Sequence, residues 1–465
     1  MIENLLIQPT GFWIAIVAFS LAGLYGVANI QRGVGIPLLA VIFTGLVWYV
    51  GDVLYNNYTL VHMLQFTVET INNAWMQVTL FLVCLLFFVA LLNGRKTNNL
   101  PQSYFLYLRG VHHPALQQML VVFLKLCVAI WLVLMLLAFL NVGAKVVYFA
   151  LPILGEKVQA FGRPRIGGGF SAILSLASNF YLLVGAGFGV VAALSTNRKI
   201  RVLAIIGCVL VWPNFFLDRT RNTMLAVFLP GVLSYVFLRL RASNAQRMAY
   251  LLIAFLFLNF WFSFVMQSRN AGMSVNNAFY EEGIEAVFGS ESQHAGLNMF
   301  EELCWMNLFI AQGSYKPNWG QRYFAELVNP VPRALWPGKP LIGLDYAMAR
   351  GQLSLSSDEA VTGTVSTGMI GQGVNNFGIF LGPVAAAFLM GLWVTILTRM
   401  DNSQSTLRLP LYLVGIVLTF NLGRDITLIT LYPFFFGWLA IKFIEKKRRR
   451  SRPGYVAEIA SIESD

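Results

Sequence analysis

Long apolar runs recur along this chain, and short polar segments that carry Lys and Arg separate them. A helix needs about 20 apolar residues to cross the hydrocarbon core of a bilayer, and most of the runs approach this length. The pattern predicts about eleven transmembrane helices, because helices satisfy their own backbone hydrogen bonds in lipid. We place them at residues 11–29, 34–54, 74–93, 116–141, 168–194, 202–217, 223–240, 249–266, 377–398, 409–422 and 426–445.

The predicted fold class is all-α, a polytopic helical membrane protein with one large loop. We assign 1–266 to the first eight helices, 267–367 to the loop, 368–445 to the last three helices and 446–465 to a tail. The loop holds several tryptophans and acidic pairs and is not of low complexity. We therefore expect it to fold against the membrane domain.

The composition supports the same class. Hydrophobic residues make up 57% of the 465 residues, only 12% are charged, and the mean hydropathy is +0.65. A soluble domain has roughly a quarter charged residues. This balance excludes a soluble enzyme, a secreted disulfide scaffold and a disordered chain, and it makes the lipid bilayer the first expected partner.

The net charge of +12 is explained by its distribution. If the helices alternate in direction, the dense basic clusters all fall on one face, as expected for the cytoplasmic side. These clusters are Arg95-Lys96, Arg198 to Arg201, Arg239 to Arg247, Arg399 with Arg408, and Lys446 to Arg450. We predict a periplasmic N-terminus and a cytoplasmic C-terminus, and we find no basic, aromatic-interleaved patch that would suggest nucleic acid.

Thirteen of the 33 basic residues fall on the opposite, outer face, where few are expected. They are Lys145, Lys157, Arg163, Arg165, Arg219, Arg221, Arg269, Lys316, Arg322, Arg333, Lys339, Arg350 and Arg424. For each of them, a solvated loop charge or a structural ion pair is an ordinary explanation. Collectively they suggest an anion site, because the planar guanidinium fork of Arg suits phosphate.

Arg219, Arg221 and Arg424 stand in turns that follow unusually short predicted helices, 202–217 and 409–422. Such helices reach only ~21–24 Å against a core of ~30 Å, so these turns would lie at headgroup depth. An arginine at that depth is costly unless it is paired or solvated. Two interpretations remain open: a pair with the neighbouring aspartate, Asp218 or Asp425, or an anion site open to the outer leaflet.

Two further segments of the outer face contain stiff or permissive residues. Residues 329–340 hold four prolines around Arg333 and Lys339, which predicts an extended path with a turn at Pro337-Gly338. A rigid segment loses little entropy when it clamps a ligand. Residues 363–378 are rich in glycine, which permits close backbone approach, although Gly378 with Gly382 is more typical of helix packing.

Candidate acid–base residues are Glu301 and Glu302, which lie on a predicted amphipathic helix at 296–312. Adjacent residues point about 100° apart on a helix, so one of the two at most faces a site. The sequence has no H-E-x-x-H, G-x-S-x-G or Asp-x-Asp motif. This disfavours a divalent-metal enzyme, so basic side chains would have to neutralise phosphate.

At these residues the chain resembles the bacterial oligosaccharide repeat-unit polymerases, the O-antigen or Wzy-type polymerases. The resemblance rests on Arg221 with the helix that it opens, on residues 332–340, and on the glycine-rich segment that ends in Asn376-Phe377-Gly378. The number of helices and the single large loop also fit.

The resemblance implies a GT-C-like, metal-independent glycosyltransferase of the bacterial inner membrane that needs no cofactor. Such an enzyme transfers a growing glycan from undecaprenyl diphosphate to the terminal sugar of an incoming lipid-linked oligosaccharide, and a chain-length regulator is an expected partner. We assign Arg219, Arg221, Arg333, Lys339 and Arg424 to phosphate and Arg269 to phosphate or sugar, and Glu301 or Glu302 to the base that accepts the hydroxyl proton.

Two alternatives remain open. A transporter or lipid flippase would need ionisable groups buried within the membrane, and the predicted helices carry almost none. An O-antigen ligase would use the same chemistry but would add one preformed chain to a different acceptor.

Overall fold

The computed structural model describes residues 8–55, 65–93, 114–154, 158–161, 171–217, 221–240, 243–270, 298–328, 331, 335–340, 344–351, 365–400 and 408–451. Every regular element in these ranges is a helix. The longer elements are α2 (Thr10–Ala28), α3 (Gly35–Gly45), α6 (Val68–Asn93), α8 (Pro114–Val142), α10 (Ser171–Leu194), α11 (Arg198–Phe216), α12 (Arg221–Leu233), α13 (Asn244–Asn270), α16 (Met299–Ala311), α19 (Gly368–Thr398), α20 (Arg408–Arg424) and α21 (Leu428–Ser451). The shorter ones are η1 (Ile30–Arg32), α4 (Gly51–Tyr55), η3 (Gly143–Lys145), α9 (Val146–Ala150), η4 (Pro152–Leu154), α17 (Gln321–Val328), α18 (Leu344–Ala349) and two π-helices, η2 (Leu46–Val50) and η5 (Ser234–Arg239).

The predicted fold class is confirmed: the chain is a polytopic helical membrane protein. Within the described residues, eight helices are long and apolar enough to cross a membrane, and three shorter apolar helices accompany them. Each of the eleven predicted ranges coincides with a helix or with a helix extended by a π-turn. The largest differences in length are those of α19, with 31 residues, and α13, with 27, which both extend well beyond the predicted ranges 377–398 and 249–266. The two helices predicted to be short are only slightly longer, with 19 residues in α11 and 17 in α20.

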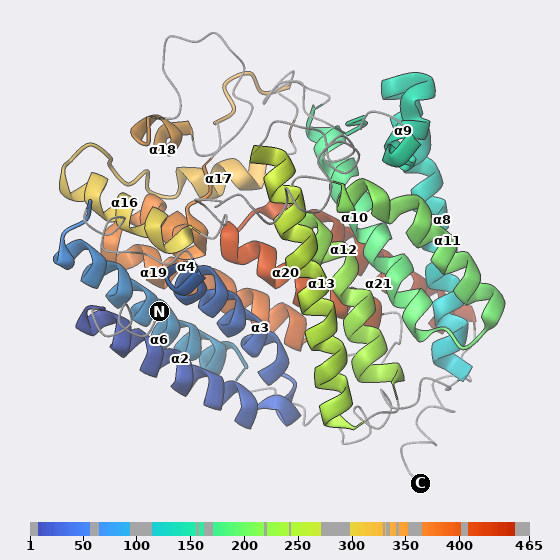
Figure 1. The fold of residues 1–465 in the computed structure, drawn as a ribbon, viewed down its shortest axis with the longest axis horizontal. Helices are drawn as coiled ribbons and strands as arrows, with labels where there is room; N and C mark the ends of the chain where they lie inside the picture. Colours follow the sequence, from blue (N-terminus) through green and yellow to red (C-terminus); the bar gives the residue numbers. More distant parts are fainter. Residues whose placement is uncertain are drawn as a thin grey trace.

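The membrane helices form two groups that α20 and α21 connect (Figure 1). In the first group, α6 packs against both α2 and α19; in the second, α10 packs against α8, α11 and α12. Helix α20 contacts α3 and α19 on one side and α12 on the other, and α21 contacts α10. The last two helices of the chain therefore hold the two groups together.

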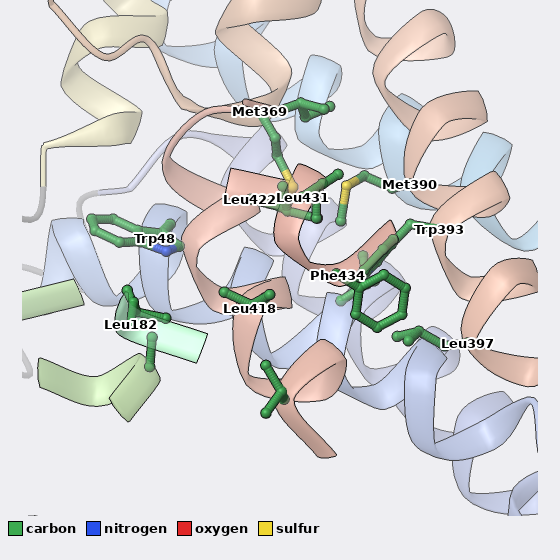
Figure 2. Packing of buried hydrophobic residues seen from close by; sticks show 14 of the residues in the cluster. Trp48, Leu182, Met369, Met390, Trp393, Leu397, Leu418, Leu422, Leu431 and Phe434 are labelled. Atoms are coloured by element: carbon green, nitrogen blue, oxygen red, sulfur yellow. The ribbon is translucent and has the colours of Figure 1, made fainter. Parts of the chain in front are cut away.

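Large aromatic side chains fix α20 in this central place. Trp48 donates a hydrogen bond from Nε1 to the Phe420 carbonyl at 2.9 Å, and Trp393 donates one to the Thr419 hydroxyl at 2.9 Å. Figure 2 shows the Trp48 and Trp393 rings on either side of α20, with Phe434 beside Trp393. Buried indole N–H groups need such acceptors, so they specify how α20 docks as well as contributing apolar area.

Gly423 lies where α20 passes closest to α3. A Cβ atom at this position would overlap the Thr44 methyl group and the Trp48 ring. We expect Gly423→Ala to lower the free energy of unfolding by about 1–3 kcal/mol, the usual effect of overpacking a close contact. Thermal unfolding in detergent would measure the effect, and Gly23→Ala is the matched control because a Cβ atom there meets nothing within 4 Å. Equal melting temperatures for the two variants would contradict the close packing of α20.

Contacts between distant segments agree with the predicted alternation of helix direction. Arg201 and Arg239 both donate to the Ser195 carbonyl, and Arg399 donates to the carbonyl of Leu92. Residues that we predicted to share a face therefore do lie together. Which of the two faces is cytoplasmic stays a prediction.

The short helices α16, α17 and α18 lie along one end of the bundle, at the top of Figure 1. We call this end the loop end. Helix α16 packs against α6 and α19, and α17 packs against α19 and α21. Two helices of the predicted large loop, α16 and α17, thus contact the membrane helices. The helix predicted at 296–312 is α16.

Candidate functional site

Two side chains of the second helical segment, Tyr49 and Asp52, organise the loop end. This segment runs through α3, η2 and α4, and its π-turn contains Trp48 and Tyr49. Tyr49 Oη accepts a hydrogen bond from the Ile370 amide at 2.9 Å, so it fixes the first turn of α19. Asp52 is fully buried and its Oδ2 atom accepts from the Phe300 amide at 2.9 Å. A carboxylate from a distant helix therefore caps the N-terminus of α16, where a negative charge is stabilising.

The glycine-rich segment forms the first part of α19. Gly378 has φ 80° and ψ −176°, so it breaks the helix into two segments. A Cβ atom on Gly373 would overlap the Gly382 carbonyl, which shows that the two segments pack directly against each other. The prediction of close backbone approach is confirmed, but Gly378 and Gly382 do not lie on one continuous helix. The first-turn amide of Ile370 is also already bound to Tyr49.

Arg322 on α17 is the cation at the centre of the loop end. Its side chain is only 3% exposed, and Nη2 forms an ion pair with Asp425 Oδ1 at 3.2 Å. The other two nitrogens, Nε and Nη1, are buried without a hydrogen-bond partner among the described residues. A buried charge with unsatisfied donors is costly, so this guanidinium is suited to an additional anionic or strongly polar acceptor.

Asp425 follows α20 and connects three segments. Its Oδ1 atom accepts from Arg322 and, at 3.4 Å, from the Thr367 amide. Burial raises the pKa of this carboxyl group above its ordinary value, although the Arg322 guanidinium opposes the shift. The alternative in which Asp425 pairs with its neighbour Arg424 is wrong, because its ion-pair partner lies 103 positions away in sequence.

Arg424 itself is exposed and donates from Nε to the Ser366 hydroxyl at 2.9 Å. At 1.5 Å per residue, the 17 residues of α20 make a helix ~26 Å long. The length of α20 therefore gives less reason to place Arg424 at headgroup depth than the predicted range 409–422 did. Arg424 nevertheless lies next to Asp425, so it remains beside the site that contains Arg322.

A network of hydrogen-bonded side chains connects Tyr315 with α19. Tyr315 donates to Asp345 Oδ2 at 2.7 Å, and Asn318 Nδ2 donates to the same oxygen at 3.2 Å. Asn318 Nδ2 also donates to Asn375 Oδ1 at 2.9 Å. Burial and the adjacent Asp345 carboxylate raise the pKa of Tyr315, so its phenol remains a proton donor.

Glu302 lies in a second buried cluster. It is 1% exposed and binds Arg350 through two hydrogen bonds, Nη2 to Oε1 at 3.0 Å and Nε to Oε2 at 3.2 Å. Tyr346 donates a short hydrogen bond to the same carboxylate. Burial and the Glu302 charge raise the pKa of Tyr346. The hydrogen bonds that Arg350 donates to Glu302 raise the pKa of Arg350 in spite of its burial. This carboxylate is therefore held in place by a cation and a phenol.

Glu301 points in a different direction from Glu302, as the helical geometry predicts. Its Oε1 atom accepts from Trp305 Nε1 at 3.2 Å, and its side chain is half-buried. The Arg350 guanidinium lies 4.5 Å from the centre of the Trp305 ring. Arg350 thus contacts both the Glu302 carboxylate and the aromatic ring that binds Glu301.

Lys339 is 7% exposed, and its Nζ atom donates to the Val331 carbonyl at 2.8 Å. The predicted turn is confirmed, because the Lys339 amide donates to the Trp336 carbonyl across Pro337-Gly338. Lys339 therefore anchors the end of the proline-rich segment.

The other predicted site residues are located only in part. Arg221 opens α12 and Arg269 lies in the last turn of α13, and the side chains of both lie outside the described part of the structure. Arg219 and Arg333 lie outside the described residues. Within the described ranges, no group of three or more His, Cys, Asp or Glu side chains is placed to hold a metal ion.

The Arg322 site was not singled out from sequence, although Arg322 was counted among the outer basic residues. Its elements are Arg322, Asp425, Thr367 and the Asn318–Asn375 pair, which come from three separate stretches of the chain. Chemically, the arrangement offers a buried cation that is paired with one carboxylate and flanked by neutral polar groups. Comparisons with protein-family models, with curated proteins and with solved structures find no match to this chain.

Proposed function

We propose that this protein is a membrane-embedded glycosyltransferase that polymerises undecaprenyl-diphosphate-linked oligosaccharide repeat units. The loop end of the bundle would then face the periplasm, and the protein would lie in a bacterial inner membrane with its C-terminus in the cytoplasm. The proposal takes its reaction from the resemblance to repeat-unit polymerases and its anion site from the residues around Arg322.

The observation that carries the proposal is the incompletely paired Arg322 guanidinium. Nε and Nη1 are buried donors without a partner in the described residues, and the helix bundle ends at this site. A diphosphate is a bidentate acceptor that Arg binds well. A lipid that carries such a headgroup can reach the end of a membrane helix bundle while its chain stays in the bilayer.

In the proposed reaction, a hydroxyl oxygen of the incoming repeat unit attacks the anomeric carbon of the growing chain. The new C–O bond forms as the bond to the diphosphate breaks, and undecaprenyl diphosphate leaves with the electron pair. Arg322 stabilises the negative charge that develops on the leaving group, and Arg424 is near enough to assist. A carboxylate accepts the hydroxyl proton.

For that carboxylate, Glu301 is a better candidate than Glu302. Glu302 would have to break its hydrogen bonds with Arg350 and Tyr346 before it could accept a proton. Arg219, Arg221, Arg269, Arg333 and Lys339 stay proposed contacts of the phosphate or sugar groups.

Reconstitution tests the proposed function. Purified protein in proteoliposomes, supplied with a lipid-linked repeat unit, should produce a ladder of products that differ by one unit, also in the presence of a chelator. Addition of one preformed chain to a different acceptor would indicate a ligase. Translocation of the lipid without any chain extension would contradict the proposal and favour a flippase.

A further inference from the structure

Two fully buried polar side chains at the start of α19 have donors or acceptors without a partner among the described residues. They are Thr367, whose Oγ1 atom accepts and donates no hydrogen bond among the described residues, and Asn375, whose Nδ2 atom donates none. Thr367 is the N-cap residue of α19, and Asn375 lies in the third turn of the helix. A Cβ atom on Gly371, halfway between them in sequence, would meet the Thr367 side chain at 3.2 Å, so Gly371 lies beside Thr367.

The direction of the Asn375 amide is fixed by its neighbours. Asp345 accepts hydrogen bonds from Tyr315 and Asn318, so Asn318 must present its NH₂ group to this carboxylate. The same NH₂ group donates to Asn375 at 2.9 Å, which requires the oxygen of Asn375 on that side. The Nδ2 donor of Asn375 consequently points away from the pair.

Thr367 lies next to the proposed diphosphate site. Its amide and the Arg322 guanidinium bind the same oxygen of Asp425, at 3.4 Å and 3.2 Å. The unpartnered atoms of Thr367, Asn375 and Arg322 thus belong to one region of the loop end. This region holds one cation, Arg322, one uncharged donor, the Asn375 amide, and one hydroxyl group, that of Thr367.

This combination matches a polyhydroxylated ring attached to a phosphate group. Sugar hydroxyls both donate and accept, as Thr and Asn side chains require, whereas a prenyl chain would leave these buried atoms unsatisfied. We propose that Thr367 and Asn375 bind hydroxyl groups of the sugar that is linked directly to the diphosphate. This inference rests on the proposed function and adds a sugar subsite to it.

Two lipids and two variants test the subsite. Binding to the full chain in nanodiscs is measured for undecaprenyl diphosphate and for undecaprenyl diphosphate that carries a single hexose. Thr367→Val and Asn375→Ala should each weaken binding of the glycosylated lipid by about fivefold to tenfold, the effect of one lost hydrogen bond. Neither variant removes a charge from the Arg322 site, so each should weaken binding of the bare diphosphate less than binding of the glycosylated lipid. Thr367→Ser, which keeps the hydroxyl group, should bind both lipids like the wild type.

The outcomes distinguish failure of the sugar subsite from failure of the proposed function. If both variants bind the glycosylated lipid as tightly as the wild type, or lose both lipids equally, the sugar subsite is refuted while the proposed function stands. If the wild-type protein binds neither lipid, the proposed function fails with it. Thr367→Val removes one hydroxyl group at nearly constant volume, so the test does not depend on whether Asn375→Ala folds.

Discussion

Arg322→Gln should lower the rate of glycan chain extension by about 10²-fold or more. The substitution keeps a polar side chain, although a shorter one, and removes the positive charge that is proposed to stabilise the leaving diphosphate. Loss of one preorganised donor to a developing negative charge costs about 10²- to 10³-fold in other enzymes. Initial rates with a lipid-linked repeat unit in proteoliposomes would measure the effect, with protein amount normalised by immunoblot.

Two variants make this prediction specific. Arg322→Lys keeps the charge but loses the planar fork, so it should retain part of the activity. Lys316→Gln removes a charge from an exposed side chain of the same segment and should have no effect. If Arg322→Gln extends chains at the wild-type rate, or if Lys316→Gln is equally damaging, Arg322 is not the diphosphate ligand.

Glu302→Ala should give the largest loss of stability among the loop-end substitutions, about 3 kcal/mol. The substitution removes the carboxylate that Arg350 and Tyr346 bind in a site where Glu302 is nearly inaccessible. The Arg350 side chain is 19% exposed. Its guanidinium would keep its contact with Trp305 but would lose its counter-ion. Unfolding in detergent by denaturant would measure the change.

A double variant separates the ion pair from simple loss of packing. Glu302→Leu with Arg350→Met replaces both charges by apolar side chains of related size and should recover most of the lost stability, because no charge is then left unpaired. If Glu302→Ala unfolds like the wild type, or if the double variant is as unstable as the sum of its single substitutions, the cluster does not stabilise the loop end.

The membrane helices could be predicted from sequence because each depends on a local property. An apolar run of sufficient length must become a helix in lipid, whatever its neighbours are. This holds even where a helix is irregular, as at the π-turn that contains Tyr49. The predicted start of α11 lies four residues inside the observed one, because Arg198, Lys199 and Arg201 continue the helix. The predicted ends of α20 differ from the observed ones by one and two residues.

The contacts at the loop end could not be predicted in this way, because they join residues that are distant in sequence. Arg322 pairs with Asp425 across 103 positions, and Asp52 caps α16 across 248 positions. Nothing in the sequence around Arg322 distinguishes it from the other outer arginines. A pair between Asp425 and the adjacent Arg424 was one of the two interpretations left open by the sequence, and the fold does not support it.

The conformation of the glycine-rich segment of α19 could be predicted only in part. The sequence indicated that the segment before Gly378 allows close backbone approach, and the structure shows that approach between Gly373 and Gly382. It did not reveal that Gly378 adopts a positive φ and divides α19, because glycine is equally compatible with a continuous helix.

Native mass spectrometry of the protein with bound lipid tests most directly whether Arg322 holds a lipid diphosphate. Wild-type protein should retain undecaprenyl diphosphate in preference to undecaprenol, Arg322→Gln should lose that preference, and Lys316→Gln should keep it. Equal retention of the two lipids by the wild-type protein, or an unchanged preference in Arg322→Gln, would contradict the account.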